Sequence, residues 1–309
     1  MRPPQFGVAL PVGPDLPAFA RHAEVLGFDY LCSGEHLMFH GPAANAFVAL
    51  SVAAGATSRV RLVSTVTLVP LYPAVLLAKM TAALDVASAG RFSLGVGVGG
   101  EYPDEFAAAG VPVGERGART DEALEVVDRL LTQERVTFSG TYTSLTDATI
   151  APRPAQSPRP PIWVAGRSPA AVRRAARYGD VWMPYMYTPE QLAQSLVAVD
   201  DQARRAGRAG WQGRAAIFAF VAVYPDRAQA RRVAVETVSQ TYRQDFAPLA
   251  DRYLIAGSPD DARRRIGEYL DAGADTVLLR LACPEDDAAS MAQRLASEVV
   301  APLRGSRGT

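Results

Sequence analysis

The segment SGEHLMFH, residues 33–40, holds two of the chain's three histidines, His36 and His40. Imidazole changes its charge near neutral pH, which makes it the side chain best suited to proton transfer under physiological conditions. A histidine can also be a structural group that is hydrogen-bonded beneath a loop. His36 is therefore predicted as a catalytic residue, with the structural role left open as the alternative.

A second candidate for chemistry is Glu101, which directly follows the glycine-rich segment SLGVGVGG. The glycines at 95, 97 and 100 have the G-x-G-x-x-G spacing of a dinucleotide-binding turn. Such a turn normally follows the first strand and runs into a helix. Here three strand–helix units come first, and EYPDEF, with its Pro103, is interpreted as non-helical. Glu101 is a candidate functional carboxylate at a predicted strand end, with a solvated side chain as the alternative.

The elements that must position these residues alternate between strand and helix along the whole chain. Continuous apolar segments are typical of parallel strands covered on both faces. Eight such segments in 309 residues predict one (β/α)₈ barrel domain, whose active site lies at the carboxyl ends of the strands. Asp15 is expected to cap the first helix. The predicted strands are 5–10, 28–34, 59–69, 91–98, 161–166, 180–184, 214–224 and 274–282, and the predicted insertions are 99–117, 135–160 and 245–258.

An anion site is predicted where Gly166, Arg167 and Ser168 precede a helix in AGRSPAAVRR. The N–H groups and the dipole at a helix N-terminus favour a phosphate, and an arginine can add a bidentate contact. The alternative is a capped helix with an exposed arginine.

Composition excludes several classes of partner. The 32 basic and 32 acidic side chains balance, so no overall field favours nucleic acid or anionic lipid. No apolar segment approaches membrane-spanning length, and Cys32 and Cys283 lie far apart in apolar surroundings. Three histidines without an H-x-H pair predict no metal site. We therefore expect a cytoplasmic protein that binds neither nucleic acid nor membrane.

The phrases AEVLGFDYLCSGEHL, GRFSLGVGVGGEYPDEF and PPIWVAGRSPAAVRRAARYGDVW resemble the luciferase-like monooxygenase superfamily. They are most similar to its actinobacterial oxidoreductases that depend on the deazaflavin coenzyme F420, and the resemblance runs from about residue 6 to residue 283. It implies an elaborated (β/α)₈ barrel, usually a homodimer, with F420 or FMN at its mouth and a small-molecule substrate.

The resemblance also implies roles for particular residues, among them that of a catalytic acid for Glu101. His36 matches a histidine at the reactive ring of the cofactor, but this chain has Phe39 and His40 where those relatives carry a tryptophan. Residues 64–66 match a bulge behind the ring, which some relatives hold with a cis bond, here Thr65–Val66; an ordinary buried strand is the alternative. The implied cofactor contacts are Ser64, Thr65, Val66, Gly97, Gly99, Gly100, Gly166, Arg167 and Ser168. The predicted substrate-pocket residues are Phe39, His40, Tyr72 and Trp182.

Three functions remain open at this point. The first is an F420-dependent oxidoreductase that moves a hydride between the deazaflavin and a small organic substrate. The second is an FMN-dependent monooxygenase, which would need a flavin reductase as partner. The third is a cofactor-binding protein without turnover. A metal-dependent barrel hydrolase is disfavoured, because it needs clustered histidine and carboxylate ligands that this chain lacks.

Overall fold

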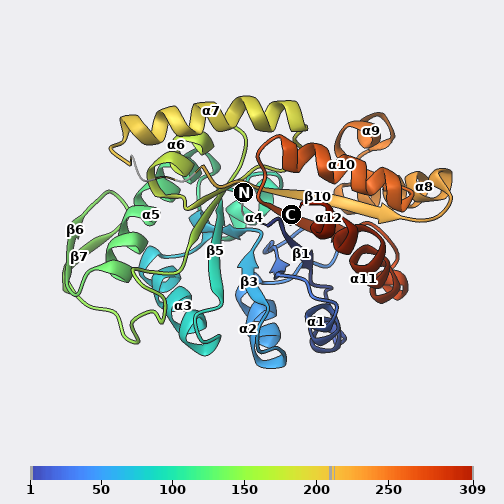
Figure 1. Cartoon of the computed structure of the whole chain (residues 1–309). Coiled ribbons are helices and arrows are strands. Elements are labelled where there is room, and N and C mark those ends of the chain that lie inside the picture. The colour runs from blue at the N-terminus through green and yellow to red at the C-terminus, as the bar shows by residue number, and fades with distance from the viewer. Residues whose placement is uncertain (1–2, 209–210, 212, 308–309) are drawn as a thin grey trace.

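Eight parallel strands and the helices outside them form the body of the molecule (Figure 1). The computed structural model describes residues 3–208, 211 and 213–307. The strands of the barrel are β1 (Gln5–Ala9), β2 (Tyr30–Ser33), β3 (Arg61–Ser64), β5 (Phe92–Gly97), β8 (Ile162–Ala165), β9 (Val181–Met183), β10 (Ala216–Val223) and β12 (Thr276–Leu281).

The sheet closes on itself. Its pairing runs β10–β12–β1–β2–β3–β5–β8–β9, and every pair is parallel. Between β9 and β10, the last gap, parallel bridges join Trp182 to Ala215 and Tyr185 to Phe218. The predicted (β/α)₈ barrel is therefore confirmed. Two short strands are added to it: β4 (Thr67–Leu68) pairs with β5, and β11 (Ile255–Gly257) pairs with β10.

Helices cover the outside of the barrel, as Figure 1 shows. A small group of inward-facing side chains, including Tyr30 and Trp163, fills the barrel below its mouth and forms a floor. The larger helices are α1 (Leu16–Val25), α2 (Ala46–Ala56), α3 (Ala74–Ala87), α5 (Arg116–Thr132), α6 (Pro169–Tyr178), α7 (Pro189–Arg205), α8 (Arg227–Tyr242), α10 (Pro259–Asp271), α11 (Ala288–Arg294) and α12 (Ala301–Arg307), with the π-helical segment η5 (Leu295–Val300) between the last two.

The three stretches predicted as insertions carry elements of their own. Residues 99–117 contain α4 (Pro103–Ala108) and the 3₁₀ turn η2 (Val113–Glu115). Residues 135–160 contain an antiparallel hairpin of β6 (Val136–Ser139) and β7 (Ser144–Ala148). Residues 245–258 contain η3 (Ala247–Leu249), α9 (Ala250–Tyr253) and β11.

Two local predictions were wrong. EYPDEF is not free of helix, because α4 begins at Pro103 and carries Asp104 and Glu105 in its first turn. Proline is well tolerated at the first helical position, and acidic side chains in the first turn interact favourably with the helix dipole. Asp15 precedes α1 but makes no side-chain cap bond. By contrast, the Ser168 hydroxyl does cap α6, accepting from the Ala171 N–H at 3.2 Å.

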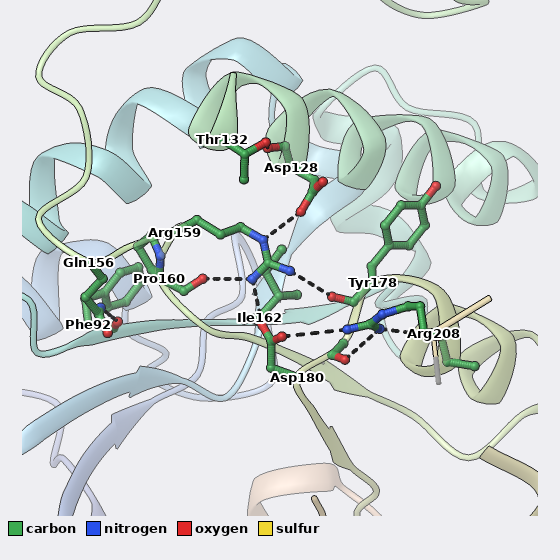
Figure 2. Close-up of polar contacts among 12 residues, drawn as sticks. Phe92, Asp128, Thr132, Gln156, Arg159, Pro160, Ile162, Tyr178, Asp180 and Arg208 are labelled. Atoms are coloured by element: carbon green, nitrogen blue, oxygen red, sulfur yellow. Dashed lines mark hydrogen bonds and ion pairs between the residues drawn. The ribbon is translucent and has the colours of Figure 1, made fainter. Parts of the chain in front are cut away.

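An ion-pair cluster holds the barrel at the end opposite the mouth (Figure 2). Arg159, just before β8, binds Asp128 of α5 at 2.6 Å and Asp180 at 2.6 Å, and Asp180 also accepts the Ile162 N–H at 2.8 Å. These contacts join β8 and β9 to α5 at the amino ends of the strands. In such barrels this end contributes stability, while the opposite end carries chemistry.

Candidate functional site

A cavity of about 280 Å³ opens at the carboxyl ends of the barrel strands. The segments after β2, β3, β5 and β8 all contribute to its wall, which brings together positions that lie far apart in the sequence. The predicted residues that line it are His36, Phe39, Thr65, Val66, Gly97, Gly99, Glu101 and Gly166.

His36 is held by a buried carboxylate. Its Nδ1 lies 3.2 Å from both carboxylate oxygens of Glu105, which belongs to α4 and has no exposed surface. The same carboxylate accepts the Leu37 N–H at 3.1 Å. Since Nδ1 is engaged by Glu105 and His36 lines the cavity, Nε2 is the ring nitrogen available to a ligand. A histidine oriented by a carboxylate in this way can take up or release a proton at one defined atom.

Aromatic rings cover His36. Phe39 stacks on its imidazole, with ring centroids 4.1 Å apart and an interplanar angle of 16°. Tyr242 of α8 meets Phe39 edge-on at 5.8 Å, and Tyr102 does so at 6.1 Å. Stacked and edge-on rings of this kind exclude water from the group that they cover.

Glu101 lies at the open side of the cavity, and its side chain is exposed to solvent. The surrounding protein nevertheless desolvates the carboxyl group enough to raise its pKa, against a lowering influence from His36 and Arg167. Burial and the negative charge of Glu101 also raise the pKa of Tyr242. Glu101 therefore retains a proton to higher pH than an ordinary glutamate.

The third predicted strand, residues 59–69, is interrupted at Thr65 and Val66, where the resemblance implies a bulge. The Thr65–Val66 peptide bond is cis, between the end of β3 and the start of β4. Thr65 and Val66 face the cavity, and the buried Thr65 Oγ1 has no hydrogen-bond partner in the described part of the chain. Ser64 is different: its hydroxyl donates to Gly95 O and accepts from Gly95 N, both at 2.8 Å, so it fixes β3 to β5 behind the wall.

Glycine is required beside Val66 and Phe106. A Cβ at Gly97 would lie 2.4 Å from the Val66 side chain, and one at Gly99 would lie 2.9 Å from the Phe106 ring. The two neighbouring side chains fill this space, so Gly97 and Gly99 present only backbone to the cavity that they line. Bare backbone beside Val66 fits the flat face of a ring.

The predicted anion site lies at the rim. Gly166 lines the cavity with φ at +110°, and α6 begins three residues later. Arg167 and Ser168 are exposed and do not contact the cavity; Arg167 donates to Met186 O at 2.9 Å. Gly100 lies outside the cavity as well. A phosphate attached to a ring in the cavity would pass Gly166 to reach the N-terminus of α6.

Three of the four predicted pocket residues do not line this cavity. Trp182 points outward, because its neighbours on β9 point into the barrel and side chains alternate along a strand. Tyr72 donates to Glu35 at 2.9 Å on the far side of the wall. His40 lies outside, against Tyr102 at 5.1 Å. Only Phe39 lines the cavity as predicted.

The neighbouring Glu35 is a structural residue. Its buried carboxylate accepts from the N–H groups of Leu68 at 2.9 Å and Ala46 at 3.1 Å, in addition to the Tyr72 hydroxyl. Burial raises the pKa of Glu35, although these donors lower it in part. Glu35 thus joins β4 to the start of α2 and supports the loop that carries His36.

Sequence reasoning missed three residues of the site: Glu105, Tyr242 and Arg280. Glu105 lies in EYPDEF, and the prediction that this segment is free of helix hid the place of Glu105 in α4. Arg280 is the one charge within the apolar segment TVLLRLA, close to the carboxyl end of the eighth predicted strand. Tyr242 gave no local signal, because it lies at the end of a helix distant in sequence.

Within residues 3–208, 211 and 213–307, no group of three histidine, cysteine, aspartate or glutamate side chains lies close enough to hold a metal ion. None of the helices in this described part of the chain is sufficiently long and apolar to traverse a bilayer.

The chain is a closed (β/α)₈ barrel with a cavity at its mouth, an architecture that many classes of enzyme share, and comparison with known proteins identifies its family. The model of the luciferase-like monooxygenase family matches residues 5–276, so the chain belongs to that family. An F420-dependent glucose-6-phosphate dehydrogenase of Beutenbergia cavernae is 32% identical in an alignment of 320 positions. This alignment covers 94% of this chain and 93% of that protein.

Solved structures give the same picture of the fold. Monooxygenase RslO1 from Streptomyces bottropensis superposes with a TM-score of 0.83 at 27% identity, covering 96% of this chain and 99% of that one. An F420-dependent secondary alcohol dehydrogenase, solved with an F420–acetone adduct, superposes with a TM-score of 0.84 at 21% identity and the same coverage of both chains. At that identity the second likeness supports the fold alone.

Proposed function

We propose that the protein is an F420-dependent oxidoreductase that transfers a hydride between the deazaflavin and a small organic substrate. The observation that carries this proposal is the His36–Glu105 pair beside a glycine-walled cavity that leads to the N-terminus of α6. The F420-dependent relative, matched over nearly the whole chain, supports the choice of cofactor.

The cavity fits the cofactor in two places. Thr65, Val66 and Gly97 would hold the ring, and the backbone from Gly166 to Ser168 would hold its phosphate. When bound, the deazaflavin supplies a carbon that accepts or releases a hydride but reacts poorly with oxygen.

The chain's own residues manage the proton. In the direction of oxidation, His36 Nε2 takes the proton of a substrate hydroxyl, and in the direction of reduction it returns one. Glu105 holds the His36 imidazole through its Nδ1 and stabilises the positive charge of the protonated imidazole. Glu101, with its raised pKa, is a second proton donor at the open side. Phe39 and Tyr242 exclude water from His36.

A monooxygenase that uses FMN is the second candidate, favoured by the likeness to the FMNH(2)-dependent dimethylsulfone monooxygenase of Pseudomonas putida, which is 29% identical over 228 residues. Parallel fluorescence titrations of the purified protein with F420 and with FMN separate the two. The proposal expects saturable F420 binding that FMN does not displace. Tight FMN binding without a response to F420 would overturn it and would imply a flavin reductase as partner.

Glu105 is expected to act as a positioning residue. Glu105→Gln retains an oxygen for the Leu37 N–H but removes the charge that His36 faces, so turnover should fall by about 10–100-fold. The KM for substrate and the affinity for F420 should change little, and Glu105→Asp should restore part of the turnover. Asp104→Asn, at an exposed position of the same helix, is the control. A KM effect with an unchanged kcat would contradict this role.

A homodimer is proposed as well. The outer faces of α2 and α3 expose Val48, Val52, Val75, Leu76 and Val86, and α2 is apolar on all sides. A helix that is apolar all round is normally covered. Lys79 is the one charged residue exposed on these two faces, which suits a self-complementary interface between two copies more than a charged partner.

Charges on this face should separate the copies. Val52→Glu combined with Leu76→Glu buries carboxylates without partners in the interface, so sedimentation should show a monomer instead of a dimer. Val197→Glu is the matched control, since Val197 is equally apolar and 63% exposed but belongs to α7. A monomeric wild type, or a dimer that survives the double substitution, would contradict the proposal.

The proposed location is the cytoplasm. Both cysteines are free and buried, and burial raises the pKa of Cys32 to about 12 and that of Cys283 to about 11. Thiols in this state are protonated and unreactive, which suits a reducing compartment.

A further inference from the structure

Arg280 has a place in the fold that the proposed reaction does not explain. It is the penultimate residue of β12, at the carboxyl end of the strand, and its side chain is half-buried. Within the described part of the chain it makes no ion pair and no hydrogen bond, and its nearest aromatic contact is Phe220 at 6.0 Å. Arg159 and Arg174, which are also largely buried, each bind an aspartate. A guanidinium stays charged in proteins, so an arginine left without a partner in a cavity wall indicates an anionic ligand.

A second cavity of about 520 Å³ adjoins the first. The two share wall residues, among them Phe39, Phe220 and Arg280. A row of aromatic rings lies between His36 and Arg280. Phe39 stacks on His36, and Tyr242 meets Phe39 edge-on. Phe220 in turn meets Tyr242, with ring centroids 6.0 Å apart. A ligand with its reacting carbon at His36 can therefore extend along these rings to the guanidinium.

The charges of the second cavity restrict the ligand. Arg280 is the one cation of its described wall, which also contains the carboxylates of Glu236 and Glu285. A phosphate dianion would meet two like charges with a single guanidinium to offset them. A carboxylate carries one charge and matches the guanidinium fork with two parallel hydrogen bonds. Apolar side chains such as Phe19, Val233 and Leu281 complete the wall, so the remainder of the ligand is apolar.

We infer that the substrate is an organic acid with an apolar body, whose carboxylate binds Arg280 while its oxidisable or reducible end lies at His36. The assignment of the reacting end rests on the proposed function. The carboxylate site itself does not, because it depends only on Arg280 and the second cavity.

Calorimetric titration of the full-length protein, with and without F420, tests the inference. The probes are 3-phenylpropanoate, its neutral amide and phenyl phosphate, which share an aromatic body and differ in charge. The variants are Arg280→Gln and Arg280→Lys, and Arg61→Gln is the matched control. Arg61 is likewise half-buried without an ion pair in the described structure, but it lies over Tyr30 at the amino end of β3, away from both cavities.

The expected result is that the wild type binds 3-phenylpropanoate more tightly than the amide or phenyl phosphate. Arg280→Gln should weaken binding of the acid by about tenfold or more, and Arg280→Lys by less, because lysine keeps the charge but loses the fork. Arg61→Gln should bind the acid like the wild type. A circular-dichroism spectrum and a melting temperature like those of the wild type in each variant show that the barrel is intact.

The inference is overturned if the amide or phenyl phosphate binds at least as well as the acid, if the acid does not bind the wild type, or if Arg280→Gln binds it as tightly. If F420 fails to bind while binding of the acid still depends on Arg280, the proposed function fails and the carboxylate site stands. If F420 binds but Arg280→Gln does not change the affinity for the acid, the carboxylate site fails and the proposed function stands.

Discussion

His36→Gln is expected to lower turnover by about 10²–10⁴-fold, the usual contribution of one positioned acid–base group. Glutamine occupies similar space and can still donate to Glu105, but it cannot take a proton from substrate. F420 affinity should stay within about twofold of the wild type, because the phosphate is held at α6 and the ring at Thr65, Val66 and Gly97.

The measurement follows F420 absorbance during oxidation of a panel of secondary alcohols, among them hydroxy acids with an apolar body, and during reduction of the corresponding ketones. His40→Gln is the matched control, since His40 lies four residues away but does not line the cavity. Full activity in His36→Gln would contradict the proton-transfer role. If His36→Gln and Glu101→Gln both turn over like the wild type, the site assignment is wrong. If the wild type binds F420 but turns over no substrate, the protein is a cofactor carrier.

Gly95→Ala is expected to destabilise the barrel by about 4 kcal/mol or more, a size reserved for severe overpacking. A Cβ at Gly95 would lie 1.8 Å from the Ser64 carbonyl oxygen. Neither side can yield easily, because the Ser64 hydroxyl binds both the N–H and the carbonyl of Gly95 at 2.8 Å. One methyl group should therefore separate β3 from β5 and disrupt the wall formed by Thr65 and Val66.

Soluble yield and denaturant titration measure this effect. Gly114→Ala is the control, because an added Cβ there meets no atom within 4 Å and its backbone φ is ordinary. A Gly95→Ala protein with wild-type stability would show that β3 and β5 are not packed as closely as the structure has them.

The barrel could be predicted from sequence because the pattern of a buried parallel strand is local. Eight apolar segments, separated by capped helices, suffice to count the units and to place residues 95–100 after the fourth strand. The position of His36 follows from the same logic, since it comes directly after the second strand.

Contacts made across the barrel could not be predicted in this way. Glu105 becomes a partner of His36 only because α4 folds back over the loop after β2, across 69 residues of sequence. Trp182 was placed in the pocket by its chemistry, but a shift of one position along β9 sends a side chain to the opposite face. Arg280 could be noticed in the sequence as a charge near the end of an apolar strand. Its role could not be predicted, because the second cavity that it lines is formed only in the folded protein.

A crystal structure of the protein grown with F420 tests the central claim most directly. The account predicts electron density for the deazaflavin ring against Thr65, Val66 and Gly97, with its phosphate at the backbone of Gly166–Ser168 and His36 facing the ring. Ring density elsewhere on the molecule, or a cavity that stays empty at saturating F420, would contradict it.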